Sequence, residues 1–114
     1  MADTTDAADQ AVTLEVIPDE HDPRRARLIG ELDLATADAL VTEVGNLAAQ
    51  GSGDLVLDIR ELSFVDSTGI RALIGISNGL GDGSLVLEGP TAGVRRVLEL
   101  VRADSFPNLR IDWG

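Results

Sequence analysis

The sequence predicts a single α/β domain with a mixed, mostly parallel sheet of four or five strands and helices packed chiefly on one face. Three observations support this prediction. Short apolar runs of strand length alternate along the chain with segments whose apolar residues recur at i, i+3 and i+4. The length of 114 residues fits one domain, and a hydrophobic fraction of 44% is typical of a globular chain. Each strand–helix–strand crossover should be right-handed and leave its strands parallel.

The N-terminal part predicts an acidic tail and an antiparallel pair of strands. Residues 1–10 are small and acidic and are expected to form a flexible tail, so the domain should span residues 11–114. Alternation of apolar and polar residues in 12–17 indicates a half-exposed strand. The segment 18–23 carries turn residues, and 26–31 alternates again. The second of these strands is therefore expected to pair antiparallel with the first.

A first helix is expected after the second strand. Thr36 is predicted to cap its N-terminus, and Gly51-Ser52-Gly53 to end it, with a glycine in the left-handed position that follows many helices. Apolar residues at i, i+4, i+7 and i+8 predict its buried stripe: Leu40, Val44, Leu47 and Ala48.

The central stretch, residues 54–76, combines a strand, a loop and a second helix. The apolar run 55–59 is typical of a strand buried on both faces, Arg60-Glu61 reads as a turn, and 62–65 is a second small apolar group. From there the spacing changes to that of a helix. Its predicted stripe consists of Ile70, Leu73, Ile74, Ser77 and Leu80.

The start of this helix is the chemically interesting position. Asp66 or Ser67 is predicted as the N-cap, because a short side-chain oxygen accepts the free amide protons of the first turn. A helix N-terminus favours negative charge, so the fold would tolerate a phosphate on Ser67. An ordinary capping motif explains the same residues. Gly69 and Gly75 leave gaps that suit close approach of a partner or a neighbouring element; tight packing explains Gly75 equally well.

The remaining elements complete the alternation. The glycines in 79–83 indicate a plain turn, because no Lys-Ser/Thr ending of a phosphate loop follows them. Residues 85–87 form a short buried strand, Thr91 starts a helix, and 109–111 form a last edge strand, with Trp113 covering an edge of the core. Whether a further helix follows stays open. The inward side of the helix consists of Val94, Val97, Leu98 and Val101.

Composition excludes several classes of function. The net charge of −11, from 20 acidic and 9 basic residues, argues against direct binding of nucleic acid and against anionic membranes. The absence of cysteine and the single histidine leave little material for a metal site or a catalytic pair. Asp58 and Asp66 lack an accompanying base or nucleophile, so we expect no enzyme activity, catalytic residue, metal or cofactor. Without an apolar stretch of membrane-spanning length or a signal peptide, a cytoplasmic protein is expected.

The predicted topology brings two polar positions together. Asp33 directly follows the second strand, and Asp66-Ser67 follow the third. The carboxyl ends of parallel strands meet at one edge of the sheet, where α/β folds commonly have their sites. Asp33, Asp66 and Ser67 are therefore expected to share one surface patch.

Three motifs in the right order resemble the STAS domain (sulfate transporter and anti-sigma factor antagonist), and most closely its stand-alone bacterial anti-sigma factor antagonists. They are GELD followed by Thr36-Ala37, FVDSTG at 64–69, and LVLEGP at 85–90 leading into residues 94–98. The resemblance covers roughly residues 12–111.

This resemblance implies a partner-switching regulator of transcription in stress response or sporulation. The unphosphorylated domain would bind an anti-sigma factor that is an ATP-bound serine kinase and so release a sigma factor. Phosphorylation of Ser67, with Thr68 as second choice, would end binding, and a PP2C-type phosphatase would reverse it. The protein would be a monomer or weak dimer. The partner surface would consist of Asp33, Asp66, Ser67, Thr68, Gly69 and Arg71.

An alternative stays open. The chain could be a STAS scaffold or regulatory subunit that binds another protein, a nucleotide or a transporter component without phosphorylation of Ser67. Phosphate transfer from ATP by a cognate kinase distinguishes the two.

Overall fold

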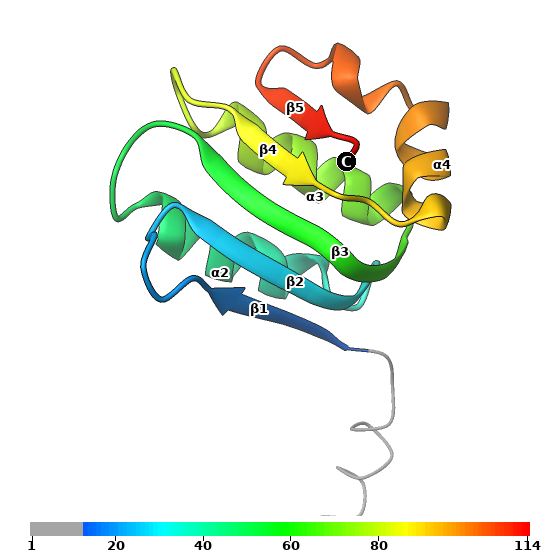
Figure 1. Ribbon diagram of the computed structural model, residues 1–114, viewed down its shortest axis with the longest axis horizontal. Helices are drawn as coiled ribbons and strands as arrows, with labels where there is room; N and C mark the ends of the chain where they lie inside the picture. Colours follow the sequence, from blue (N-terminus) through cyan, green and yellow to red (C-terminus); the bar gives the residue numbers. More distant parts are fainter. Residues whose placement is uncertain (1–12) are drawn as a thin grey trace, which may run out of the picture.

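Five strands form one mixed sheet in the order in which they occur along the chain (Figure 1). The computed structural model describes residues 13–114, so the predicted tail, residues 1–10, and the predicted strand start at Val12 lie outside the described residues. The elements are β1 (Leu14–Pro18), β2 (Arg25–Leu32), α2 (Ala37–Ala48), β3 (Leu55–Val65), α3 (Ser67–Asn78), β4 (Leu85–Glu88), α4 (Ala92–Leu100), the 3-10 turn η1 (Ala103–Ser105) and β5 (Leu109–Asp112).

The sheet confirms the predicted fold class. β1 pairs antiparallel with β2, and all later neighbours pair in parallel. α2 and α3 connect β2 to β3 and β3 to β4, and both lie behind the sheet in Figure 1. The parallel strands therefore end at one edge, and α2 and α3 both begin there.

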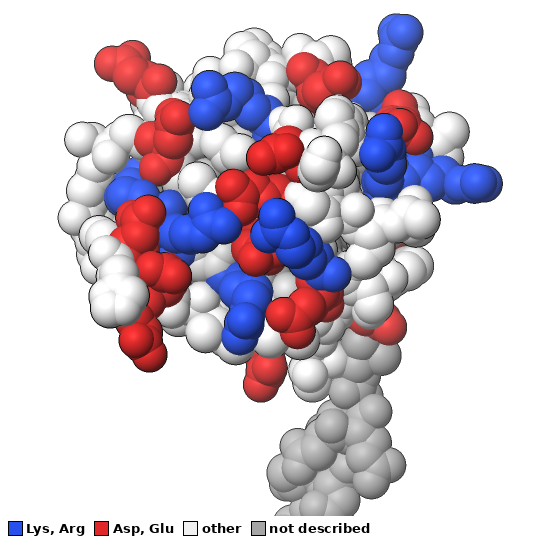
Figure 2. Space-filling view, in the orientation of Figure 1, with Lys and Arg blue, Asp and Glu red and all other residues white. Residues whose placement is uncertain are grey.

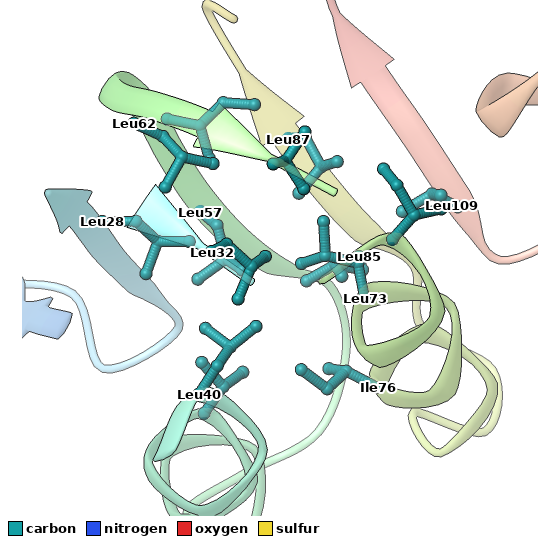
Figure 3. Packing of buried hydrophobic residues seen from close by; sticks show 14 of the residues in the cluster. Leu28, Leu32, Leu40, Leu57, Leu62, Leu73, Ile76, Leu85, Leu87 and Leu109 are labelled. Carbon is teal, nitrogen blue, oxygen red and sulfur yellow. The ribbon is translucent and has the colours of Figure 1, made fainter. Parts of the chain in front are cut away.

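The core lies between the sheet and these helices. Inward residues of the strands alternate with outward ones, and the helices contribute their predicted stripes (Figure 3). Most buried members of this cluster are leucines. Burial of each such side chain contributes about 1.5–3 kcal/mol to the free energy of folding, so the cluster is the main source of stability. Its fully buried members include Leu28, Leu32, Leu40, Leu55, Leu57, Leu62, Leu85, Leu87 and Leu98.

The prediction that residues 55–59 are buried on both faces is wrong. Leu55, Leu57 and Ile59 are buried, but Val56 and Asp58 are only half-buried. β4 alternates in the same way. The reason is that α2 and α3 lie on the other face, so this face carries intermingled acidic and basic side chains (Figure 2).

Charged groups on this open face bind one another. Arg25 donates a hydrogen bond to Glu88, and Arg60 lies 3.1 Å from Asp58 and 4.0 Å from Glu88. The hydrogen bond to Glu88 raises the pKa of Arg25, against the opposing effect of desolvation. These pairs cross-link β2, β3 and β4 where no helix covers the sheet.

The predicted turn at Arg60-Glu61 is also wrong, because β3 continues through it to Val65. Two register shifts against β2 occur there, between Arg27 and Ile29 and between Gly30 and Glu31, and each gives β3 one extra residue. Such bulges bend a strand without ending it. The polar pair at 60–61 therefore marks a bulged segment of one long strand.

α2 ends differently from the prediction. Its C-cap is Ala49 in right-handed conformation, and the left-handed glycine is Gly53 (φ 94°), farther along the loop. The Arg24 guanidinium donates hydrogen bonds to the carbonyls of Ala48 at 2.9 Å and Gly53 at 2.8 Å. Arg24, which precedes β2, therefore satisfies a free carbonyl group at the end of α2, where a glycine motif was predicted.

The stripes of the later helices are largely as predicted. In α3, Ile76 is buried in addition, whereas Ile74 is only partly buried. In α4, Thr91 is the N-cap, but Val101 is 39% exposed because the helix ends at Leu100. Trp113 packs against the core as expected, with the Arg95 guanidinium carbon 4.9 Å from the ring centroid.

Candidate functional site

The start of α3 is held by Asp66. This residue is the N-cap, with extended backbone, and its Oδ1 accepts a hydrogen bond from the Gly69 amide at 2.9 Å. Of the two residues predicted as the N-cap, Asp66 and Ser67, Asp66 is the one that caps the helix. Ser67 is the first helical residue, and its side chain is exposed.

Close packing against β2 fixes where α3 begins. The Asp66 amide donates a hydrogen bond to the Leu32 carbonyl at 3.2 Å. Gly69 is buried, and a Cβ on it would lie 2.7 Å from the Leu32 carbonyl oxygen and 2.9 Å from Val65 Cγ2. Only glycine lets the first turn of α3 approach the ends of β2 and β3 this closely. Gly69 thus serves packing beneath the surface that Ser67 exposes.

The turn after β2 is a second ordered segment at this edge. Asp33 Oδ1 accepts a hydrogen bond from the Ala35 amide at 3.0 Å. Thr36 occupies the N-cap position of α2 as predicted, but makes no side-chain bond to that helix. Its hydroxyl accepts from the Asp33 amide at 3.0 Å and donates to the Glu31 carbonyl at 2.9 Å. Thr36 therefore shapes the turn that carries Asp33.

Strand pairing brings these two segments side by side. Leu32 and Val65 are paired residues at the ends of β2 and β3. Asp33 and Asp66 are the next residue in each chain segment, so both leave the sheet at the same edge. Asp33 and Asp66 are half-buried and Ser67 is exposed. The structure thus has the juxtaposition that the topology predicted.

The other predicted site residues lie along the first turns of α3. Thr68 is half-buried, and Arg71 is exposed. Both follow Ser67 within one helical turn or slightly more, so they belong to the same region of the surface.

Two apolar residues at this edge were missed by the sequence analysis. Leu34, in the turn after β2, is 78% exposed, and Phe64, near the end of β3, is 45% exposed. Apolar type alone predicts burial of both side chains. The bulge between Gly30 and Glu31 leaves Phe64 outside the buried row, which a sequence pattern does not reveal. Only the position of Leu34 in the loop between a strand and a helix indicated that its side chain could be exposed.

The edge therefore carries the exposed Ser67 hydroxyl, the carboxylates of Asp33 and Asp66, an arginine and two exposed apolar side chains. We name the surface formed by Asp33, Leu34, Phe64, Asp66, Ser67 and Arg71 the switch edge. Within residues 13–114, no group of three or more His, Cys, Asp or Glu side chains could hold a metal ion. The same part of the chain has no helix long and apolar enough to span a membrane.

A separate groove of about 640 Å³ lies between α2 and α3. It is lined by small and apolar residues, mainly from the second halves of these helices, together with Arg24. None of the switch-edge residues lines it.

Loss of the Asp66 cap should destabilise the domain modestly. Asp66→Ala removes the acceptor of the Gly69 amide, and we expect a loss of about 1 kcal/mol in the free energy of unfolding. Asp66→Asn keeps a side-chain oxygen and should lose a few tenths at most. Urea denaturation of both variants measures the difference. Equal stability of the two would contradict the capping role.

Comparison with known proteins agrees with this architecture. The sequence pattern of the STAS domain matches residues 17–112. An anti-sigma factor antagonist from Mycobacterium paratuberculosis is 31% identical, with a TM-score of 0.64 over 88% of this chain and 86% of that one.

Two structures of the anti-sigma factor antagonist SpoIIAA share the fold at lower identity. The unphosphorylated form is 23% identical, with a TM-score of 0.63 over 89% of this chain and 87% of that one. The phosphorylated form, from Bacillus, is 21% identical, with a TM-score of 0.57 over 89% and 90%. By the match over 17–112 and the mycobacterial relative, this chain belongs to the STAS domain family.

Proposed function

We propose that this protein is an anti-sigma factor antagonist that acts in the cytoplasm. In its unphosphorylated form it binds an anti-sigma factor with serine kinase activity, and the sigma factor is released. The kinase transfers a phosphoryl group from ATP to Ser67, which ends binding, and a PP2C-type phosphatase restores the active form. The observation that carries this proposal is the exposed Ser67 hydroxyl at the first position of α3, beside Asp33 and Asp66.

Exposure favours Ser67 over Thr68 as the acceptor. A kinase must reach the hydroxyl oxygen, and the Ser67 side chain is exposed whereas Thr68 is half-buried. Phosphorylation of Ser67 also puts negative charge at the N-terminus of α3, where the helix dipole favours it. The fold should therefore survive the modification unchanged.

The composition of the switch edge suits a protein partner. Leu34 and Phe64 offer exposed apolar area. Asp33, Ser67 and Arg71 supply polar groups around it. Protein interfaces typically combine apolar anchors with a polar rim, and a few anchors dominate the affinity.

Two structures of a similar protein support the proposed phosphorylation switch. SpoIIAA, an anti-sigma factor antagonist similar to this chain, has structures in unphosphorylated and phosphorylated forms. A STAS domain of this size and element order is therefore compatible with a phosphorylation switch.

Phosphate transfer tests the proposal against a STAS scaffold that needs no phosphorylation. The protein is incubated with ATP and the kinase that copurifies with it, and the modified residue is identified by peptide mass spectrometry. We expect one phosphate, on Ser67, in the wild type and in Thr68→Ala, and none in Ser67→Ala. If the partner stays bound but the wild type and both variants carry no phosphate, the result would favour a STAS scaffold instead.

A further inference from the structure

We infer that Arg71 binds the phosphoryl group of phosphorylated Ser67 along the surface of α3, an inference that rests on the proposed phosphorylation. Arg71 lies four residues after Ser67 in the same helix, and both side chains are exposed. Residues at i and i+4 are neighbours on a helix surface. An anionic group N-terminal to a cationic one is the favourable orientation of such a pair.

Arg71 is available for this contact. Five other arginines form ion pairs with carboxylates: Arg25, Arg27, Arg60, Arg95 and Arg110. Arg24 instead binds backbone carbonyls. Within the part of the chain that the structure describes, Arg71 forms neither an ion pair nor a side-chain hydrogen bond. A phosphate on Ser67 would therefore not have to displace a partner of Arg71 among residues 13–114.

The surroundings of Ser67 make this cation significant. The charged residues at the start of α2 and α3 and in the turn after β2 are otherwise acidic: Asp33, Asp38 and Asp66. Arg71 is the one basic residue of α3. A phosphate at neutral pH carries a charge of about −1.5 to −2, so these carboxylates would repel it. The guanidinium offsets part of this repulsion inside the domain, whereas a docked partner would still meet the phosphate.

The ionisation of the phosphate tests this inference without any kinase. Phosphoserine is incorporated at position 67 during translation, and its titration is followed by phosphorus NMR at low salt. A guanidinium favours the dianion, so it lowers the second pKa of the phosphate. Arg71→Gln should therefore raise that pKa by about 0.4. High salt should reduce the difference.

Arg110→Gln is the matched control. It removes the same charge from an exposed position on β5, where Arg110 pairs with Asp54 just before the start of β3, and should leave the pKa unchanged. Arg71→Lys should retain part of the effect, since lysine keeps the charge but not the planar fork. Equal pKa values in the wild type and Arg71→Gln would overturn the inference. Failure of a kinase to modify Ser67 would instead refute the proposed function, so the two failures are distinguishable.

Discussion

Ser67→Asp is expected to weaken binding of the anti-sigma factor kinase at least about a hundredfold, a loss of about 2.7 kcal/mol. The substitution puts a fixed charge at the exposed first position of α3, next to Asp66 and at the edge that carries Asp33. A partner that docks there would either have to strip water from this charge or be repelled by it, and both effects weaken binding. Ser67→Ala should bind as the wild type does, because it only removes a hydroxyl.

Ser52→Asp is the control for this prediction. Ser52 is an exposed serine in the loop between α2 and β3, at the opposite end of the sheet from Ser67. The substitution Ser52→Asp adds the same charge as Ser67→Asp and should leave the affinity for the kinase unchanged. Calorimetric titration of the purified kinase with the three variants measures the effect. Similar affinities for Ser67→Asp and Ser67→Ala would rule out a charge switch at this position.

Gly69→Ala should destabilise the domain by about 3 kcal/mol, the upper part of the range for overpacking. The added Cβ would lie 2.7 Å from both Cγ and the carbonyl oxygen of Leu32, and 2.9 Å from Val65 Cγ2. The backbone oxygen cannot rotate away, so α3 must shift from the end of β2. That shift would also move Ser67, so partner binding should weaken as well.

Gly75→Ala provides the matched control in the same helix. Nothing lies within 4 Å of a Cβ at Gly75, so the suggestion that tight packing explains this glycine is wrong. Alanine there should stabilise the domain by up to about 1 kcal/mol, because glycine is a poor helix former. Urea denaturation of both variants gives the comparison. Equal changes in the free energy of unfolding for the two substitutions would show that the close approach of Gly69 to Leu32 does not exclude a larger residue there.

The sequence predicted the element order and the site edge because both depend on local spacing and on general rules of topology. Helical periodicity located α3, and the identity of Asp66 located its cap. Parallel pairing then required Asp33 and Ser67 to share an edge, which the pairing of Leu32 with Val65 produces. No contact between distant residues had to be known for these steps.

The features that were missed depend on contacts between distant residues. The bulges in β3 arise from its register with β2, and they leave Phe64 exposed. The end of α2 is bound by Arg24, a residue far away in sequence. The half-exposed Val56 follows from the absence of α2 and α3 from that face of the sheet, which a run of apolar residues does not reveal.

We propose that the phosphorylation state of Ser67 controls partner binding. The most direct test of this proposal is a paired capture from the source lysate, with Ser67→Ala and Ser67→Asp as baits. We expect that only the alanine form retains an ATP-dependent serine kinase, and that this kinase phosphorylates the wild type but not Ser67→Ala. Retention of the same proteins by both baits, or of a kinase by neither, would contradict it and leave Ser67 as the first residue of a helix in a scaffold domain.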